Sequence, residues 1–280
     1  MAKTIKEILI AATQALAGGD SPQIDAELLL AHCLQSGREY LRTHPDSALE
    51  AGSLDKFQTL LRRRQEGEPV AYLLGYKDFW DIRLEVNSDV LIPRPETELL
   101  IEAALEIPGN AGALSVLDLG TGSGAIALAL ANNRPHWQVL GVDISEGALA
   151  LARRNAARLE LKNVILAKGD WCQGLEAKSF DLVLANPPYV AAYDNHLQQG
   201  DLRFEPQLAL VAEEDGYADL FAIIESATAV LKEDAWLMLE HGYEQHASLA
   251  EKLVSVGYRD VEVRHDLAGH ERVTQARWVG

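Results

Sequence analysis

The stretch that decides the fold is Asp118-Leu119-Gly120-Thr121-Gly122-Ser123-Gly124-Ala125. An apolar run at 114–119 leads into it and predicts a strand, and the pattern at 125–132 that follows predicts a helix. Glycines at such a strand-to-helix turn let the backbone approach a ligand closely. The stretch therefore predicts a nucleotide-type binding loop in an α/β fold.

Strand and helix patterns continue to alternate after this loop. Strands are predicted at 137–142, 164–168, 180–185 and 235–240, and helices at 146–159, 217–231 and 243–256. This alternation predicts a mostly parallel sheet covered on both faces, closed by an antiparallel edge pair at 258–264 and 273–278. Residues 190–216 carry few periodic positions, and a loop of that length in a compact domain is usually functional.

The first part of the chain shows helical periodicity and no strand pattern. Helices are predicted at 5–16, at 26–34 and from 46 or 53 to 64, where Arg62-Arg63-Arg64 would complement the helix dipole as a solvated end. A hairpin is predicted within 76–91, and a helix from 93 to 105 closed by Pro108-Gly109-Asn110. We therefore expect a helical domain at 1–74, a hairpin linker at 75–92 and an α/β domain at 93–280.

Composition narrows the classes of function. The 280 residues include 48% hydrophobic residues and carry a formal charge of −17, which repels phosphate backbones, so stable nucleic-acid binding is not expected. Two cysteines, Cys33 and Cys172, show no metal-ligand spacing, so no metal is expected and a reducing compartment is favoured. No signal-peptide core or membrane-length apolar run is present, which predicts a cytoplasmic location and no membrane partner.

The glycine loop and the next strand predict a nucleotide cofactor. Gly120, Gly122 and Ala125 satisfy the dinucleotide pattern G-x-G-x-x-G/A. Asp143 lies 23 positions after Gly120 at a strand end, where a carboxylate takes both hydroxyls of a ribose. These features fit NAD and S-adenosylmethionine equally.

Three further features favour S-adenosylmethionine. Gly124 completes G-x-G-x-G, and Asp118, two positions before the loop, would support the cationic methionine end. Asp170 and Trp171 end the third strand, where they would accept from the adenine amino group and cover its ring. For each of these two residues a structural role remains an equal alternative: a strand-end turn for Asp170 and hydrophobic cover for Trp171.

The second motif is Asn186-Pro187-Pro188-Tyr189, which ends the predicted strand at 180–185. Two consecutive prolines cannot continue a strand, because each lacks a backbone N–H and has a fixed φ. An Asn-Pro turn alone is usually just a strand stop. At the carboxyl end of a parallel strand, however, the turn lies where open α/β sheets bind their ligands.

The tetrapeptide has the atoms to hold a planar NH2 group. The side-chain oxygen of Asn186 and the carbonyl of Pro187 are two acceptors that would fix the plane of such a group for methyl transfer. Tyr189 would pack against its flat face. Adenine, cytosine and the glutamine amide share this geometry, so the tetrapeptide does not choose among them.

The chain resembles the HemK/PrmC-type family, the protein-(glutamine-N5) methyltransferases of peptide chain release factors. The resemblance rests on the two motifs above and on these stretches: Glu68-Pro69-Val70-Ala71-Tyr72-Leu73-Leu74-Gly75, Ile92-Pro93-Arg94-Pro95-Glu96-Thr97-Glu98, Leu239-Glu240-His241-Gly242 and Asp266-Leu267-Ala268-Gly269-His270-Glu271-Arg272. It implies a Rossmann-like methyltransferase fold with a mostly parallel seven-stranded sheet. It also implies N5-methylation of the glutamine in a Gly-Gly-Gln motif, which modulates translation termination.

The resemblance assigns roles to particular residues. The helical domain and hairpin would recognise the release factor, with Arg94 nearby in an unspecified role. The substrate glutamine would lie against Asn186, Pro187, Pro188 and Tyr189, with Asn186, Pro187 and Tyr189 as the catalytic set. S-adenosylmethionine, and S-adenosylhomocysteine as product, would contact Gly120, Thr121, Gly122, Ser123, Gly124, Asp143, Asp170, Trp171 and Asn186. The alternative is a DNA or RNA adenine-N6 methyltransferase, against which the charge argues.

Overall fold

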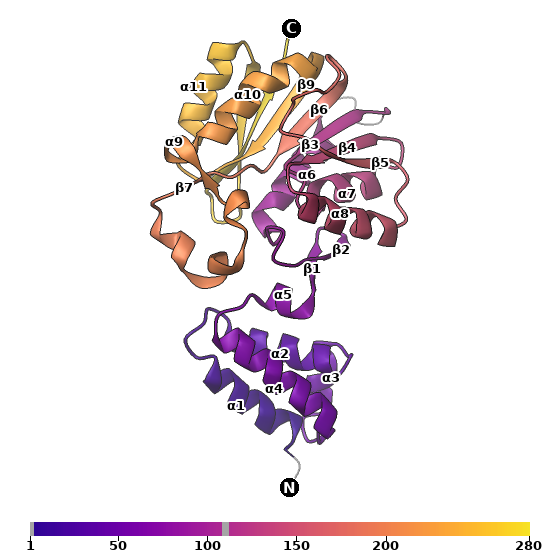
Figure 1. Cartoon of the computed structure of the whole chain (residues 1–280), viewed down its shortest axis with the longest axis vertical. Helices are drawn as coiled ribbons and strands as arrows, with labels where there is room; N and C mark the ends of the chain where they lie inside the picture. Colours follow the sequence, from indigo (N-terminus) through magenta and orange to yellow (C-terminus); the bar gives the residue numbers. More distant parts are fainter. Residues whose placement is uncertain (1–2, 108–111) are drawn as a thin grey trace. The chain divides into compact units, whose positions relative to one another are not determined.

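The chain folds into two compact units, described by a computed structural model for residues 3–107 and 112–280 (Figure 1). The first unit runs to Tyr76 and also contains Asn195–Phe204, and the second contains Lys77–Asp194 and Glu205–Gly280. The expectation that all of 93–280 forms one domain therefore differs from the structure at 195–204. A stretch without periodicity carries no sign of which neighbour it packs against.

The first unit is a bundle of helices: α1 (Ile5–Ala15), α2 (Pro22–Cys33), α3 (Arg38–Thr43), α4 (Ala51–Gln65) and α5 (Val70–Leu74). Thr4 and Glu7 form a capping box that starts α1. The bundle closes on a core that includes Ile5, Leu29 and Phe57, all buried. The short helix α3 was not predicted, because six residues are too few to display helical periodicity.

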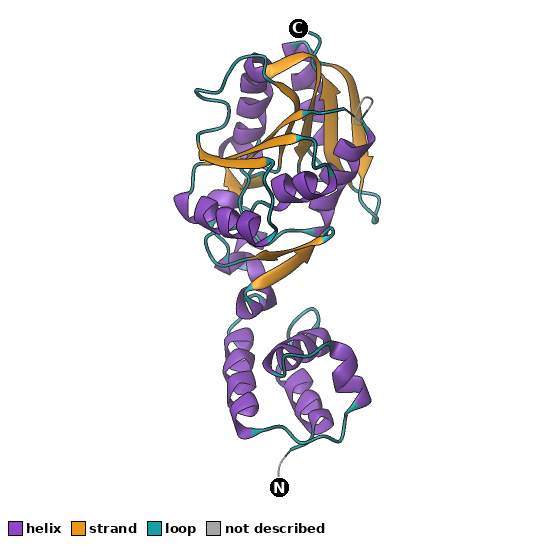
Figure 2. Ribbon diagram, turned by 90° about the vertical axis from the view of Figure 1, so that its right-hand side faces the viewer, coloured by secondary structure: helices purple, strands orange, loops and turns teal. Residues whose placement is uncertain are grey.

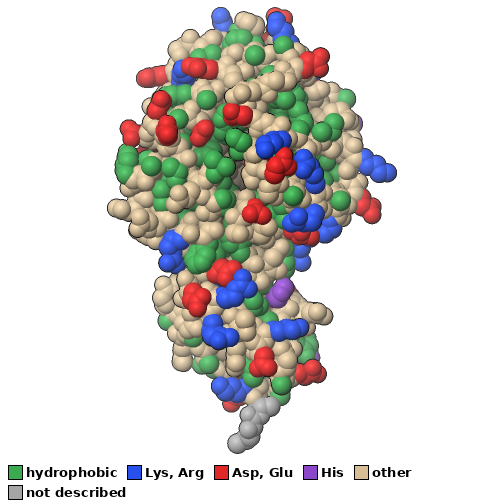
Figure 3. All heavy atoms as spheres, in the orientation of Figure 1, with side chains coloured by type: hydrophobic (Ala, Val, Ile, Leu, Met, Phe, Trp, Pro, Cys, Tyr) green, Lys and Arg blue, Asp and Glu red, His purple; other side chains and the backbone are tan. Residues whose placement is uncertain are grey.

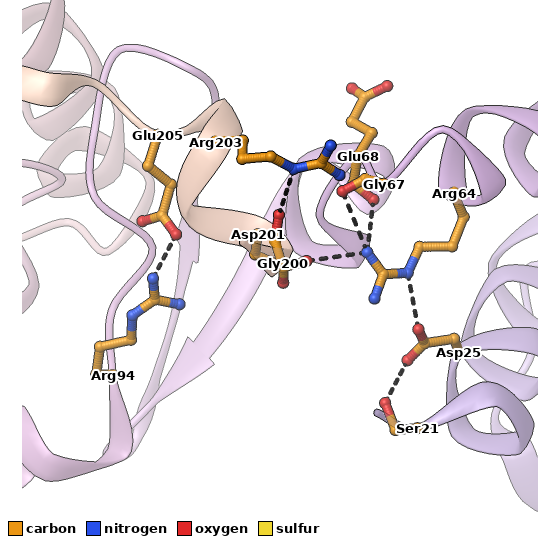
Figure 4. A network of polar contacts seen from close by, with 10 residues as sticks. All are labelled: Ser21, Asp25, Arg64, Gly67, Glu68, Arg94, Gly200, Asp201, Arg203 and Glu205. Atoms are coloured by element: carbon orange, nitrogen blue, oxygen red, sulfur yellow. Dashed lines mark hydrogen bonds and ion pairs between the residues drawn. The ribbon is translucent and has the colours of Figure 1, made fainter. Parts of the chain in front are cut away.

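Arg64 is largely buried, contrary to the solvated helix end predicted for the arginine triplet. Its guanidinium bonds Asp25 at 2.8 Å through Nε and Asp201 at 2.9 Å through Nη1, and it also donates to the carbonyls of Gly67 and Glu68 (Figure 4). Asp201 belongs to the 195–204 segment. Arg64 thus fastens that segment to the helices of the first unit.

The second unit is built on a seven-stranded sheet, whose strands are orange in Figure 2. The strand order is β10-β11-β9-β6-β3-β4-β5. The pairs β3–β4, β4–β5, β3–β6 and β6–β9 are parallel, and β11 runs antiparallel to both β9 and β10. This confirms the predicted mostly parallel sheet and its antiparallel edge pair. The strands are β3 (Ser115–Leu119), β4 (Gln138–Asp143), β5 (Val164–Lys168), β6 (Phe180–Ala185), β9 (Leu231–Glu240), β10 (Arg259–His265) and β11 (Glu271–Arg277).

Two hydrophobic cores lie on opposite faces of this sheet. Along β6, Leu182 and Leu184 join one core, whereas Val183 joins the other, as the alternation of strand side chains requires. Helices α6 (Glu98–Glu106), α7 (Ala125–Asn133) and α8 (Glu146–Arg158) cover one face, and α10 (Ala218–Val230) and α11 (His246–Val256) cover the other (Figure 1).

The remaining segments are short. A two-stranded sheet pairs β1 (Tyr76–Phe79) with β2 (Ile82–Glu85), and η1 (Pro95–Thr97) precedes α6. The long stretch after the tetrapeptide contains β7 (Val190–Ala191), η2 (Asn195–Gln198), η3 (Gly200–Phe204), η4 (Gln207–Ala209), β8 (Val211–Ala212) and α9 (Glu213–Gly216). The predicted helix stop at Pro108-Gly109-Asn110 lies outside the described residues. Over the described part of the chain, no helix is both long and apolar enough to cross a membrane.

Candidate active site

Both sequence motifs leave the sheet at the same point. Strands β3 and β6 are parallel neighbours, with Leu119 opposite Ala185. From β3 the chain adds β4 and β5 on one side, and later β6 and β9 on the other, so the strand order reverses between β3 and β6. Open α/β sheets bind ligands at the carboxyl ends of the strands beside such a reversal. The glycine loop and the tetrapeptide border one cavity there.

The glycine loop adopts a backbone that favours glycine. Gly120, Gly122 and Gly124 have φ angles of +70°, +55° and +87°. Gly120 and Gly122 line the cavity together with Thr121 and Ser123. Gly124 is absent from the lining, and a Cβ there would lie 2.8 Å from a Leu128 methyl group. Gly124 therefore permits α7 to pack closely after the loop.

Asp118 lies beneath the loop, because it is fully buried and does not line the cavity. Its Oδ2 accepts from the Thr121 hydroxyl at 2.6 Å and from the Ala127 N–H at 3.1 Å. Burial raises the pKa of Asp118 to about 7. The carboxylate ties the loop to the start of α7 through Oδ2, and its support of the methionine end of a ligand stays a prediction.

Asp143 lies at the end of β4 and lines the cavity, as its spacing predicted. Oδ2 accepts from the Gly122 N–H at 2.8 Å, and Oδ1 accepts from the Ser145 N–H at 2.8 Å. Each carboxylate oxygen offers about two lone-pair sites, so both oxygens retain a free site for a further donor. The residue holds the loop and still has capacity to accept from a ligand.

Trp171 forms a flat wall opposite the glycine loop. A Cβ added to Gly120 would lie 3.4 Å from the Trp171 ring, which shows how closely loop and indole face each other. The Trp171 indole also hydrogen-bonds Asp219, a residue at the start of α10 whose pKa is raised by burial. Asp170 lines the cavity beside it and accepts from Gln173 at 2.7 Å.

The cavity has a volume of about 280 Å³, and all of its lining residues belong to the second unit. Its charged side chains have one sign: Asp89, Asp143, Asp170 and Asp219 line it, whereas no Lys or Arg of the described residues does. The apolar part of the lining includes Val90, Ile126, Ile144, Trp171 and Leu208. Four carboxylates without a counter-charge favour a cationic ligand over one with a pyrophosphate.

Asn186 is oriented by a neighbour outside the tetrapeptide. Its Nδ2 donates to the hydroxyl oxygen of Thr97 at 3.1 Å, which leaves the amide oxygen available to another donor. Pro187 and Pro188 line the cavity with it. Tyr189 does not line the cavity in this structure, and its hydroxyl donates to Oε1 of Glu240 at 3.2 Å.

Glu240 ends β9 and is 1% exposed. Burial raises the pKa of Glu240 to about 7, although the hydrogen bonds from Thr97 and Tyr189 act in the opposite direction. Burial next to this carboxylate also raises the pKa of the Tyr189 phenol. Glu240 thereby connects η1 to the tetrapeptide after β6.

Sequence reasoning missed several residues that hold the site. Thr97 and Glu240 lay in stretches quoted for the family resemblance, but no role followed from them. Gln245 is buried and its amide donates to the carbonyls of Tyr189 and Gly216. Asn155 on α8 bonds both Glu85 and the Ser123 carbonyl, so it ties β2 to the glycine loop. Only Asn155 left a signal in the sequence, because it is a polar residue on the buried face of a predicted helix.

Arg94 acquires a role from the structure. It forms an ion pair with Glu205, whose side chain is fully buried (Figure 4). The other carboxylate oxygen of Glu205 accepts from the Ile92 N–H at 2.9 Å. Glu205 is the first residue of the second unit after the 195–204 segment. The pair therefore fixes the point where the chain re-enters the second unit.

Among the residues that the structure describes, no group of three or more His, Cys, Asp or Glu side chains is arranged to hold a metal ion. On the face shown in Figure 3, acidic side chains predominate on the left of the second unit, and most of the basic side chains lie on the right with some acidic ones among them.

Comparisons with known proteins cover nearly the whole chain. Residues 7–75 match the family described as PrmC N-terminal domain, and residues 111–271 match the family described as Methyltransferase domain. Proteins named release factor glutamine methyltransferase are similar: that of Shewanella oneidensis is 45% identical, covering 95% of this chain and 93% of the relative. That of Pseudomonas aeruginosa is 47% identical (92% and 94% covered), and that of Escherichia coli is 42% identical (94% and 95%).

Solved structures share the fold of the second unit. A methyltransferase from Pyrococcus furiosus superposes with a TM-score of 0.54 at 21% identity, covering 70% of this chain and 88% of that one. TYW2 from M. jannaschii, solved in complex with AdoMet, gives a TM-score of 0.50 at 14% identity, with 72% and 84% covered. These neighbours confirm the predicted methyltransferase fold.

Proposed function

The chain belongs to the release factor glutamine methyltransferases, and from that premise we propose that its cavity holds S-adenosylmethionine beside the glutamine amide of a release factor. The proposed product is an N5-methylated glutamine within a Gly-Gly-Gln motif. Release factors act in translation, so the proposed place of action is the cytoplasm and the proposed effect is on translation termination.

The negative charge of the cavity favours S-adenosylmethionine over NAD as the cofactor. S-adenosylmethionine has a sulfonium and an ammonium group, and the lining offers four aspartates and no basic side chain among the described residues. NAD, the other cofactor that the glycine pattern allows, would bring a doubly anionic pyrophosphate into the same space. The residues present therefore fit the sulfonium compound better.

The polar groups of the lining also fit that cofactor. Asp143 keeps one free acceptor site on each oxygen for ribose hydroxyls, and the Trp171 ring gives the lining a flat face on which a base could stack. Asp170 would accept from the adenine amino group. When bound, S-adenosylmethionine supplies an electrophilic methyl group on its sulfonium sulfur.

The tetrapeptide would hold the amide that receives the methyl group. The Asn186 amide oxygen and the Pro187 carbonyl would accept the two N–H bonds of the glutamine NH2, fix its plane and increase electron density on nitrogen. Tyr189 and Pro188 would complete the substrate contact. The glutamine nitrogen would form the new N–C bond as the C–S bond breaks, with the electron pair of that bond left on the thioether sulfur. The nitrogen would then release one proton to water, so no base is needed beforehand.

The first unit and the β1–β2 sheet are proposed to recognise the release factor. Methylation of adenine N6 in nucleic acid is not favoured by the formal charge of −17, which repels phosphate backbones. Stable binding of nucleic acid is therefore not part of the proposal.

The test uses the full chain with labelled S-adenosylmethionine and offers purified release factor, DNA and RNA separately. We expect label only in release factor, mapped by mass spectrometry to the glutamine of Gly-Gly-Gln. Asn186→Ala should abolish most transfer while leaving some cofactor binding. Asn132→Ala, which truncates an exposed asparagine of α7, is the control and should be fully active. Label in nucleic acid alone, or full activity of Asn186→Ala, would overturn the proposal.

A further inference from the structure

The orientation of the Asn186 amide is the starting point. A carboxamide has an acceptor end and a donor end, and rotation by a half turn exchanges them. The substrate NH2 group needs the acceptor end, because a flipped amide would point its own N–H bonds at the N–H bonds of the substrate. The site therefore works in one of two orientations of nearly identical shape.

Thr97 selects between these orientations in the structure. Its hydroxyl oxygen accepts from Asn186 Nδ2 at 3.1 Å, which directs Asn186 Oδ1 elsewhere. Thr97 is 3% exposed, so water does not compete readily for the hydroxyl. A hydroxyl, however, is both donor and acceptor, so Thr97 alone would accommodate either end of the amide.

Glu240 removes that ambiguity. In its ionised form the Glu240 carboxylate only accepts hydrogen bonds, and it is hydrogen-bonded by the Thr97 hydroxyl and by the Tyr189 phenol. The single hydroxyl proton of Thr97 is thus directed to Glu240, and a lone pair remains for the Asn186 NH2 group. Burial raises the pKa of Glu240 to about 7, so the relay has this direction in the ionised form, which dominates above that pH.

The charges that face Glu240 are mixed. Glu96 on η1 disfavours its ionised form, whereas Arg272 on β11 favours it. The Tyr189 hydroxyl donates a second hydrogen bond to the same carboxylate. Asn186 is linked to that carboxylate through Thr97, and Tyr189 is linked to it directly. The carboxylate thereby connects the first and last residues of the tetrapeptide through two hydroxyl groups.

We propose that Thr97 and Glu240 are positioning residues which, through a one-way hydrogen-bond relay, hold the acceptor end of Asn186 toward the substrate amide. The relay rests on the proposed role of Asn186. It predicts that removing the Thr97 hydroxyl impairs the transfer step and leaves ground-state binding of both substrates nearly intact.

The test compares Thr97→Val with Thr97→Ser in methylation of release factor by the full chain. Valine keeps the branched shape without the hydroxyl, whereas serine keeps the hydroxyl. We expect Thr97→Val to lower kcat at least about tenfold, with KM and the affinity for S-adenosylhomocysteine within about twofold, and Thr97→Ser to retain at least about half of kcat. Thr228→Val, which removes a threonine hydroxyl from α10, is the matched control and should retain full kcat.

Three results would overturn the relay: kcat of Thr97→Val within twofold of the unmodified protein, a rise in KM that accounts for the whole loss, or equal damage in Thr97→Ser. If Thr97→Val does not fold, Glu240→Leu decides the question alone. Leucine offers no acceptor, so the Thr97 hydroxyl is free to donate to Asn186 and the relay loses its direction; lowered kcat with unchanged KM supports the proposal and unchanged kcat overturns it.

Failure of the relay is distinguishable from failure of the proposed function. If Asn186→Ala is inactive while both Thr97 variants are fully active, the substrate assignment stands and the relay is wrong. If Asn186→Ala is fully active, the assignment of the tetrapeptide itself is wrong.

Discussion

Replacing Asp143 by asparagine changes one atom type at the point where the loop and the proposed cofactor meet. Each carboxylate oxygen accepts one backbone N–H at 2.8 Å, and the new NH2 group must face either the Gly122 or the Ser145 N–H. One ribose hydroxyl would then meet a neutral acceptor, and the other would meet the new NH2 group, which cannot accept its hydrogen bond. At about 1–1.5 kcal/mol for each of these two bonds, the loss in cofactor binding is about 2–3 kcal/mol.

That loss corresponds to a Kd for S-adenosylhomocysteine roughly 30- to 150-fold higher, which isothermal titration calorimetry measures directly. Asp81→Asn is the control, since it removes the same charge from an exposed side chain that bonds only Asn132 and Asn133 among the described contacts. Thermal unfolding should show that Asp143→Asn is folded. A Kd within threefold of the unmodified protein would refute the proposed role of Asp143 as the acceptor for the ribose.

Three further predictions concern stability, measured by urea unfolding. Gly124→Ala should lower the free energy of unfolding by about 2–5 kcal/mol, because the strain of its left-handed φ adds to a clash with Leu128. The control is Gly174→Ala, which has a φ of +73° in open space and should lower the free energy of unfolding by only about 1–2 kcal/mol. Equal losses would contradict the packing role of Gly124. The folded pKa of Asp118, about 7, lies above its ordinary 3.8, so this group makes stability fall as pH rises from about 4 to 7. Asp118→Asn should weaken that fall, and an unchanged pH dependence would count against the buried charge. Arg94→Met should lower the free energy of unfolding by up to about 3 kcal/mol. This is the lower end of the range for a broken buried ion pair, because the Arg94 side chain is 30% exposed. Adding Glu205→Gln to Arg94→Met should restore part of the lost stability.

Much of the fold followed from the sequence, because buried parallel strands and amphipathic helices leave clear periods. The strand at 180–185 and the helix at 146–159 were placed within a residue of β6 and α8. The helix predicted from 243 begins at His246, and the strand predicted from 235 begins at Leu231, since caps and strand ends depend on neighbours rather than on local pattern. The path of 195–204 was unpredictable because the Arg64–Asp201 contact joins residues far apart in the chain.

The site was predictable where a backbone rule or a family pattern applied. Positive φ angles explain why the loop is built from glycine, and the strand-end position of Asp143 follows from its distance along the chain. The roles of Thr97, Glu240 and Asn155 were not predictable, because each depends on a contact between residues distant in sequence. The burial of Asp118 was also not predictable, because its place next to the loop in sequence does not show that its carboxylate lies beneath the loop in space.

The membership of residues 195–204 in the first unit has a consequence for the order in which the protein is made. The helices up to Tyr76 leave the ribosome first, yet Asp201, which Arg64 binds, is synthesised more than a hundred residues later. At roughly 5–20 residues per second, that delay is on the order of 6–25 seconds. During this interval Arg64 lacks one of its two carboxylates, so the helical unit reaches its final form only after β3, β4, β5 and β6 have been synthesised. A fragment that ends at the first boundary between the units would remain permanently in that unfinished state.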